Sequence, residues 1–326
     1  MNILVTGAAG YVGSVCAAEL VRQGHRVVAY DNLTAGHRQA VVEHVQFVKG
    51  DIADTEKLRR VCKKHRIEAV MHFAASALVE ESIRNPLLFY RNNVSGTLSL
   101  LEVLAALKIQ RLIFSSSAAV YGEPKSVPIR EDHPTSPVNP YGETKLAIER
   151  ALAWFHGAYG IKCASLRYFN AAGATGDLGE DHRPETHLLP RLLAAASAPQ
   201  GSFEIYGDDY PTADGTCVRD FVHVLDIAQA HILALHSLSK LGSRIYNVGH
   251  GKGYSIRAVV KAVEEIAGHR LDVLVGSRRA GDPAVLVASA RELRRELKWE
   301  PRHSDLKNII RSAWAWMQKF PKGYRR

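Results

Sequence analysis

The sequence has 326 residues, 46% of them hydrophobic and 23% charged, and a formal net charge of +9. This length allows two domains with a full core, and the composition is that of a globular protein and not of a disordered one. The four cysteines form no CxxC pair, and no uncharged apolar run approaches the ~20 residues of a membrane span. We therefore expect neither disulfides, a metal site nor a membrane protein.

The ends and the charge of the chain narrow the class further. The N-terminal stretch MNILVTGAAGYVG has no basic region before an apolar core, so we expect no signal peptide and a cytoplasmic protein. The basic clusters are mixed with acids and are not interleaved with aromatic residues, so we expect no nucleic-acid partner. The excess positive charge instead suits an anionic small substrate.

The first half of the sequence alternates β-rich runs with amphipathic helical stretches. Helical patterns at 14–24 and 98–108 separate some of these runs. Alternating strands and helices predict βαβ units and a parallel, doubly wound sheet of the Rossmann type. The predicted strands are at 2–7, 25–30, 45–50, 68–75, 111–117 and 162–169.

The pattern changes after Asn170, where a segment rich in Gly, Pro, Asp and Glu (173–185) leads into shorter mixed elements. A β-rich run at 245–249 is predicted to return to the main sheet. Helical patterns follow near 255–268, 289–297 and 304–319. We therefore predict an α/β fold with a dinucleotide-binding domain over 1–172, rejoined by about 224–250, and a smaller C-terminal mixed α/β domain over 173–326.

The sequence LVTGAAGYVG places three glycines between a predicted strand and a helix. Gly7 permits a tight turn, Gly10 lets the backbone approach a pyrophosphate, and Gly13 allows close helix–strand packing. The N–H groups at the start of the helix then face the anion. Asp31 ends the next predicted strand, where a carboxylate accepts from the adenosine ribose and repels a 2′-phosphate. The pattern predicts dinucleotide binding, with NAD favoured over NADP.

The sequence NPYGETK places Tyr141 and Lys145 four residues apart after a proline. Residues at i and i+4 share one face of a helix, and a nearby ammonium favours the phenolate form of a tyrosine. Taken alone, the stretch also fits an exposed helix start with Pro140 at its first position. Ser117 follows the fifth predicted strand, at the carboxyl edge where such sheets bind ligands.

The glycine spacing G-x-x-G-x-x-G together with Tyr-x-x-x-Lys resembles the short-chain dehydrogenase/reductase superfamily. The resemblance implies that Tyr141 is the catalytic tyrosine, that Lys145 also holds the nicotinamide ribose, and that Ser117 bonds the reacting hydroxyl. Nucleotide-sugar 4,6-dehydratases usually carry an Asp-Glu pair just after this serine. Here those positions are Ala118 and Ala119, so elimination chemistry lacks its acid and base.

Nearly the whole chain resembles the UDP-glucose 4-epimerases of the extended NAD-dependent epimerase/dehydratase family. The shared motifs include YDNL, NNVSGT, SSSAAVYG and RYFNAAGA, and the most specific are YGDDYPTADGTCVRDFVHV and RRAGDPA. The resemblance implies reversible interconversion of UDP-glucose and UDP-galactose, with hydride passing from C4 to a tightly bound NAD and returning to the opposite face. It also implies a homodimer, in which apolar positions in 84–107 and 141–159 could pair.

The resemblance further implies a set of binding residues around the catalytic three. The UDP diphosphate would be held by Arg219 and Arg279, because a guanidinium donates two parallel hydrogen bonds and does not lose its charge. The implied cofactor-binding residues are Gly7, Gly10, Tyr11, Val12, Gly13, Asp31, Asn32, Asp51, Ile52, Phe73, Ala74, Ala75, Asn93, Tyr141, Lys145 and Tyr168. The implied substrate-binding residues are Ser117, Tyr141, Asn170, His187, Leu188, Tyr206, Arg219, Arg279 and Asp282.

Several positions depart from the family pattern and leave alternatives open. His187 stands where Asn is frequent on the phosphate side, and Leu286 stands where some members have a tyrosine walling the sugar. His223, within FVHV, is interpreted as a structural histidine. The remaining alternatives are a UDP-GlcNAc, UDP-arabinose/xylose or UDP-glucuronate 4-epimerase, a UDP-glucuronate decarboxylase, or a dinucleotide-sensing or RNA-associated protein without catalysis.

Overall fold

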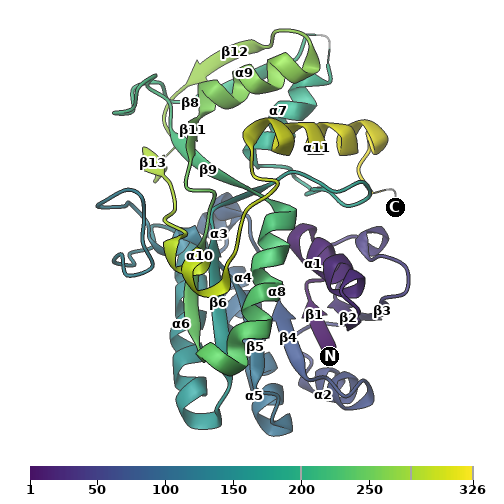
Figure 1. Cartoon of the computed structure of the whole chain (residues 1–326). Helices are drawn as coiled ribbons and strands as arrows, with labels where there is room; N and C mark the ends of the chain where they lie inside the picture. The colour runs from purple at the N-terminus through teal and green to yellow at the C-terminus, as the bar shows by residue number, and fades with distance from the viewer. Residues whose placement is uncertain (199, 280, 325–326) are drawn as a thin grey trace.

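The protein has two parts of unequal size (Figure 1). The larger part, called the large layer below, is a seven-stranded parallel sheet with its flanking helices, and a smaller mixed α/β region lies above it. The computed structural model describes residues 1–198, 200–279 and 281–324. The strand order is β10-β6-β5-β4-β1-β2-β3, and every pairing is parallel. The strands are β1 (Asn2–Thr6), β2 (Arg26–Asp31), β3 (Gln46–Lys49), β4 (Ala69–His72), β5 (Arg111–Ser117), β6 (Lys162–Tyr168) and β10 (Arg244–Val248).

Alternation along β1 explains why the sheet has helices on both faces. Ile3 and Val5 pack into one apolar cluster with side chains of α1 and α8, whereas Leu4 packs on the opposite face with those of α2, α5 and α6. Side chains of a strand point alternately to the two faces, so a strand apolar at every position is buried on both. The main flanking helices are α1 (Tyr11–Arg22), α2 (Thr55–Lys64), α5 (Gly96–Leu107), α6 (Pro140–Tyr159) and α8 (Val224–Leu241).

Short elements connect the main helices and strands of the large layer. Between β4 and α5 the chain forms three successive helical turns that lie beside α6. The three turns are α3 (Val79–Arg84), α4 (Pro86–Phe89) and η2 (Tyr90–Ser95), and the other short elements are η1 (Arg38–Ala40) and η3 (Ala118–Val120).

The smaller region is built around β9 (Val218–His223), which pairs with three short strands. One of them, β7 (Asn170–Ala172), falls within the predicted first domain but pairs here, so the domain boundary at residue 172 stays a prediction. The remaining elements are α7 (Leu188–Ala196), β8 (Ser202–Tyr206), β11 (Gly253–Ser255), α9 (Ile256–Ala267), β12 (Asp272–Gly276), β13 (Val285–Leu286), α10 (Arg291–Leu297) and α11 (Leu306–Lys319).

The fold expected from the sequence is confirmed. All six strands predicted in the first half are present, and the run at 245–249 is β10, hydrogen bonded to β6 at the edge of the sheet. The chain therefore leaves the large layer after β6 and comes back to it through α8 and β10 (Figure 1). No helix within the described residues is long and apolar enough to cross a membrane.

The start of α6 fixes the Tyr-x-x-x-Lys sequence in space. The Asn139 side chain accepts a hydrogen bond from the Gly142 N–H at 2.9 Å, and Pro140 occupies the first helical position. An N-cap of this kind satisfies an N–H that the helix cannot pair, and a proline at this position costs no hydrogen bond. Tyr141 and Lys145 consequently lie one turn apart on the same face, and both are buried.

Candidate active site

The carboxyl edge of the sheet collects the predicted cofactor residues. Gly7 follows β1 and Phe73 follows β4, while Ser117 and Tyr168 end β5 and β6. The strand order reverses between β1 and β4, and ligands of open α/β sheets bind in the crevice at such a reversal. The fold thus places the ends of four strands where a dinucleotide and a substrate can meet.

The glycine loop has the close packing that a pyrophosphate cradle needs. Gly7 has φ +70°, and a Cβ there would lie 2.5 Å from the Ala74 backbone nitrogen. A Cβ on Gly13 would lie 2.1 Å from the Gly7 carbonyl oxygen, so no side chain fits at either position. Tyr11 and Val12 form the first turn of α1 directly after Gly10. The glycine loop therefore leads into the N-terminus of α1 without side chains at Gly7, Gly10 and Gly13, which fits the anionic part of NAD.

Asp31 is positioned by the backbone of the same loop. Its carboxylate accepts hydrogen bonds from the Ala9 N–H at 3.0 Å and the Leu33 N–H at 2.8 Å. Burial raises the pKa of this carboxyl, and the two N–H groups act in the opposite direction. A carboxylate held in this way at the end of β2 keeps acceptor capacity for ribose hydroxyl groups, as NAD binding requires.

The next loop along the edge carries the predicted adenine-side residues. The Asn32 side chain donates to the Asp51 carboxylate at 2.9 Å, and Asp51 also accepts from the Ala53 N–H. Ile52 is buried against Gly96 at the start of α5, where a Cβ would come within 2.7 Å of its Cδ1 atom. These contacts bring Asn32, Asp51 and Ile52 together beside Asp31.

Asn93 joins the loop after β4 to α6. Its side chain accepts from the Ser76 N–H at 2.7 Å and donates to the Ser76 carbonyl at 3.0 Å and to the Thr144 hydroxyl at 3.1 Å. Ala74 and Ala75 immediately precede Ser76, which these hydrogen bonds hold in place. Asn93 therefore holds the strip from Phe73 to Ser76 against α6 and leaves its own side chain fully paired.

Two aromatic residues predicted to lie on the cofactor side share one neighbour. The rings of Phe73 and Tyr168 both lie against the ring of His231, with centroids at 4.8 and 6.2 Å. The Tyr168 hydroxyl is 2.8 Å from the Ser115 hydroxyl, and burial raises its pKa well above the ordinary value. Tyr168 is therefore a neutral wall of the site.

Lys145 is a buried ammonium with a single backbone acceptor. Its side chain is 3% exposed, and Nζ donates to the Ser115 carbonyl oxygen at 2.8 Å. Burial lowers its pKa to about 7, although the Glu149 carboxylate acts in the opposite direction. A lysine in this state can gain or lose a proton near neutral pH, which a lysine in water cannot.

Tyr141 differs from the expectation drawn from the sequence. The pKa of Tyr141 is raised, because the effect of burial outweighs that of a hydrogen bond with the Ser117 side chain, which acts in the opposite direction. Lys145 does not lower the pKa of Tyr141 as the sequence predicted. Its Nζ atom lies 5.7 Å from the Tyr141 ring centroid, and burial disfavours the positive charge of Lys145. The structure thus brings Ser117, Tyr141 and Lys145 together but leaves the phenol protonated.

The two predicted diphosphate arginines both have carboxylate partners. Arg219, in β9, pairs with Asp282 at 3.0 Å and donates to the Pro283 carbonyl at 2.8 Å. Arg279 pairs with Glu80 of the large layer at 3.3 Å, and its guanidinium lies 4.6 Å from the Tyr206 ring centroid. Ala280, within the motif RRAGDPA, lies outside the described residues. The arginines are therefore oriented by acids, and the pair between Arg279 and Glu80 spans the two layers.

The other predicted substrate residues lie on three elements of the smaller region. Asn170, at the start of β7, donates to the Asp220 carbonyl at 3.0 Å. His187 precedes Leu188, the first residue of α7, and its Nδ1 atom faces the Glu180 and Glu185 carboxylates at 2.9 and 3.1 Å. This nitrogen of His187 therefore faces carboxylates in the structure, and a role of His187 in substrate binding stays a prediction.

Leu286 and His223 also receive definite surroundings. Leu286, in β13, is paired in register with Arg219 and packs against a buried apolar cluster that includes Ala118, Leu146 and Phe169. His223 is buried at the end of β9, where its Nδ1 atom accepts from the Leu225 N–H and caps α8. Its Nε2 atom is 3.1 Å from the Ser312 hydroxyl.

Sequence reasoning missed Asp220, which fixes the backbone beside the predicted substrate-binding residue Arg219. Its carboxylate accepts from the His250, Gly251 and Ala288 N–H groups at 2.9 to 3.1 Å. Burial raises its pKa to about 6 against the effect of these donors. Asp220 is next to Arg219 in the motif VRDF, and an acid beside a predicted substrate-binding arginine was the available signal.

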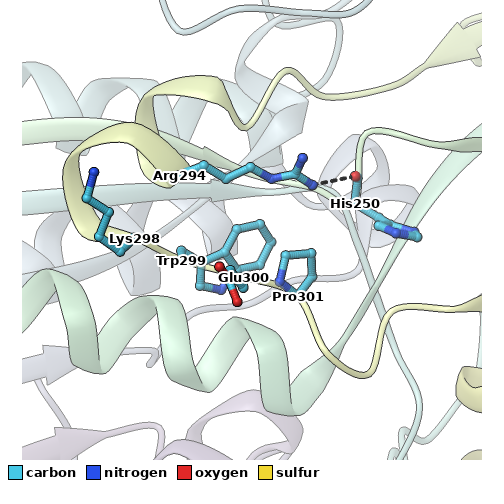
Figure 2. Close-up of a pocket in the computed structure, with 6 residues that line it drawn as sticks. All are labelled: His250, Arg294, Lys298, Trp299, Glu300 and Pro301. Atoms are coloured by element: carbon cyan, nitrogen blue, oxygen red, sulfur yellow. Dashed lines mark hydrogen bonds between the residues drawn. The ribbon is translucent and has the colours of Figure 1, made fainter.

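A surface cavity of about 440 Å³ lies elsewhere (Figure 2). In this view Arg294 donates to the His250 carbonyl oxygen across one side of the cavity. None of its lining residues is a predicted site residue. They are His250, Arg294, Lys298, Trp299, Glu300 and Pro301.

Comparison with known proteins identifies the class to which this arrangement belongs. Residues 3–249 match the family described as the NAD dependent epimerase/dehydratase family. The chain belongs to this family.

Relatives within the family carry a narrower activity. The chain is 47% identical to the UDP-glucose 4-epimerase of Lactobacillus helveticus over 327 aligned positions, covering 99% of each chain. The crystal structure of UDP-glucose 4-epimerase from Brucella ovis in complex with NAD has a TM-score of 0.92 and 47% identity, covering 96% of this chain and 97% of that one. That of Bifidobacterium longum, in complex with NAD+ and UDP, has a TM-score of 0.94 and 37% identity, covering 99% and 100%.

These full-length similarities confirm three predictions from the sequence. The chain is an isomerase, its cofactor is NAD, and its activity is that of the UDP-glucose 4-epimerases. The alternative of a dinucleotide-sensing protein without catalysis is correspondingly set aside. The roles of the individual site residues remain predictions.

Proposed function

We propose that the chain interconverts UDP-glucose and UDP-galactose reversibly by transient oxidation at C4 of the sugar, using NAD that stays bound. The observation that carries this proposal is the set of half-buried Ser117 and buried Tyr141 and Lys145 at the carboxyl edge, beside a glycine loop that excludes side chains. When bound, NAD supplies a reversible hydride acceptor at C4. Everything else falls to residues of this chain.

Proton transfer is assigned to Tyr141. In this role it accepts the proton of the 4-hydroxyl group, while Ser117 bonds both the phenol oxygen and the reacting hydroxyl. Burial disfavours the phenolate of Tyr141 and the ammonium of Lys145 separately, but two opposite charges formed together stabilise each other. We assign the phenol's own proton to the neutral Lys145 amine, so that phenolate and ammonium form together, and the Tyr141 phenolate then takes the proton of the 4-hydroxyl group; the steps reverse when the proton is returned.

The diphosphate is assigned to Arg219 and Arg279. Their present partners Asp282 and Glu80 orient the guanidinium groups, and a diphosphate would share or replace these carboxylates. Holding the sugar through its diphosphate lets the hexose turn and present its other face. Tyr206, under the Arg279 guanidinium, is in position to pack beside the same part of the substrate.

We infer a preference for UDP-glucose over N-acetylated sugars that is not strict. Leu286 is half-buried beside Arg219 and lacks the ring and the hydroxyl of a tyrosine. Differences in pocket size are typically worth ~1–3 kcal/mol of discrimination. The test is kcat/KM for UDP-glucose and UDP-GlcNAc in wild type and Leu286→Tyr. Absence of N-acetyl activity in wild type, or equal losses on both substrates in the variant, would refute this inference.

We also propose a homodimer in the cytoplasm. Large apolar side chains are exposed on α3 to α5 and on α6, which lie beside one another, and Trp154 is 80% exposed. An exposed patch of this kind is typical of an interaction surface. The four cysteines are free and buried, which suits a reducing compartment.

The activity is tested with the purified chain and a panel of UDP-sugars. We expect UDP-glucose and UDP-galactose to be interconverted without added cofactor, and NAD to be released on denaturation. The panel includes UDP-GlcNAc, UDP-xylose and UDP-glucuronate, the last also assayed for carbon dioxide. Protein that needs NADP, or that acts on UDP-glucuronate and leaves UDP-glucose unchanged, would contradict the proposal.

A further inference from the structure

Four metal-ligating side chains converge just before α7, outside the proposed catalytic set. The segment Glu-Asp-His-Arg-Pro-Glu-Thr-His contributes Glu180, His182, Glu185 and His187, and one donor atom of each lies within 4.8 Å of every other. The cysteines predict no metal site, whereas the spacing E-x-H-x-x-E-x-H places two histidines and two glutamates within one short segment.

The donor atoms have the spacing of a small coordination sphere. His187 Nδ1 is 2.9 Å from Glu180 Oε1 and 3.1 Å from Glu185 Oε1. His182 Nδ1 is 3.3 Å from Glu180 Oε1 and 3.6 Å from Glu185 Oε2. Tetrahedral Zn²⁺ with bonds of ~2.1 Å requires donors separated by roughly 3.4 Å. The four separations bracket this value.

Burial and hydrogen bonding favour a ligand at the centre of the cluster. His182 Nδ1 is buried and lies at ion-pair distance from both carboxylates, but it makes no hydrogen bond of regular geometry to a described residue. The Glu180 side chain is 10% exposed, and Glu185 is oriented by the Thr186 and His187 N–H groups at 2.9 and 2.8 Å. Backbone donors that fix a carboxylate are typical outer partners of a metal ligand.

We propose that Glu180, His182, Glu185 and His187 form a four-ligand site for Zn²⁺ or a similar divalent cation. Two carboxylates and two neutral imidazoles leave a charge of −2, which one divalent cation neutralises. Four protein ligands fill a tetrahedral sphere, so the site is structural and gives no open position for a substrate.

The position of the site indicates what it stabilises. His187 is the residue from which α7 starts, and Asp181, inside the segment, accepts from the Tyr324 N–H and faces His37 Nε2 at 3.4 Å. His37 follows β2 in the large layer, and Tyr324 follows α11. A cation would therefore hold the segment 180–187 where it joins the two layers.

The alternative to a bound cation is protonation of both histidines, His182 and His187. If both imidazoles are protonated, the same four side chains form ion pairs at the same distances and need no metal. The experiment must therefore detect the cation itself. Metal binding is measured independently of turnover, so its failure leaves the epimerase proposal untouched.

The test uses the full chain, freed of metal by a chelator and dialysed. Zn²⁺ is titrated against a chromophoric competitor, Co²⁺ is added to a second sample for visible absorption, and the melting temperature is measured with and without Zn²⁺. We expect one bound Zn²⁺ per chain, the intense bands of four-coordinate Co²⁺, and a raised melting temperature.

Glu180→Gln and His182→Asn should each weaken Zn²⁺ affinity by at least about tenfold. The matched control is His44→Asn, an exposed histidine at φ +68° where asparagine is well tolerated. If the ligand variants fail to fold, the Co²⁺ spectrum of wild type decides alone. The proposal is overturned if wild type binds no Zn²⁺ or gives only weak six-coordinate Co²⁺ bands. It is also overturned if the folded ligand variants bind Zn²⁺ as tightly as His44→Asn does.

Discussion

At the scale of single residues, the account depends most on Tyr141. Tyr141→Phe keeps the buried ring and removes the hydroxyl that bonds Ser117. We expect kcat for UDP-glucose to fall by ~10²–10⁴, the usual contribution of a general acid–base group, with bound NAD and melting temperature preserved. Tyr159→Phe, at the exposed end of the same helix, is the control. A Tyr141→Phe enzyme within a few-fold of wild type would show that another group moves the proton.

His72 gives a second residue-scale prediction, concerning pH. Its Nδ1 atom is 2.7 Å from the Thr6 hydroxyl and its Nε2 atom 2.8 Å from the Thr97 hydroxyl, which itself donates to the Asn93 carbonyl. Thr97 must therefore accept from Nε2–H, and Nδ1 accepts from Thr6. Burial, assisted by Lys145, lowers the His72 pKa to about 3, so the imidazole is neutral in the folded protein.

The sign of the effect follows from proton uptake. The unfolded histidine has a pKa near ~6.5, so between that value and about 3 the unfolded state binds the extra proton. Stability from His72 is fully present above pH ~6.5 and is lost as the pH falls. We expect His72→Asn to reduce the pH slope of the free energy of unfolding by about 1 kcal/mol per unit between pH about 5 and 6. Urea unfolding with excess NAD measures it, and equal slopes in both proteins would contradict the assignment.

At the scale of elements, α6 carries the two proposed functions on opposite sides. Its inner face carries Tyr141 and Lys145, and its outer face carries Trp154, which is almost fully exposed. Because apolar side chains lie on both the inner and the outer face, the sequence of this 20-residue helix does not divide clearly into one apolar and one polar side. The outer face needs a partner, and a second copy of the chain is the proposed one.

Trp154→Glu tests this partner. A charge in the centre of an apolar contact is left desolvated and unpaired, so we expect the dimer to dissociate to monomers at concentrations where wild type stays paired. Light scattering after size-exclusion chromatography gives the mass of each species. Leu274→Glu, on the exposed β12, is the matched control and should behave like wild type. A wild-type monomer, or a Trp154→Glu dimer as tight as the control, would argue against this surface.

At the scale of the whole molecule, local spacing in the sequence predicted what depends on local geometry. The strands, the glycine turn and the helical pairing of Tyr141 with Lys145 all follow from periodicity over a few residues. The return of β10 to the sheet followed from a single apolar run. The family resemblance added the activity, which the comparisons confirm.

Properties that depend on the folded interior could not be predicted in the same way. The pKa of Tyr141 is raised because burial outweighs its neighbours, and burial is not visible in the motif. The pair between Arg279 and Glu80 joins residues almost 200 positions apart, and Asp220 meets its three backbone donors only after β9, β10 and β13 assemble. The convergence of Glu180, His182, Glu185 and His187 likewise depends on the fold of their loop.

The central claim is that C4 is oxidised and reduced within one bound complex, and isotope exchange tests it most directly. UDP-glucose is converted in D₂O, and carbon-bound deuterium in the UDP-galactose is measured by mass spectrometry and NMR. The account predicts no deuterium on carbon, because Tyr141 exchanges only the hydroxyl proton and the C4 hydrogen returns from the cofactor. Deuterium at C4, or at C5 as elimination would leave it, would contradict the account.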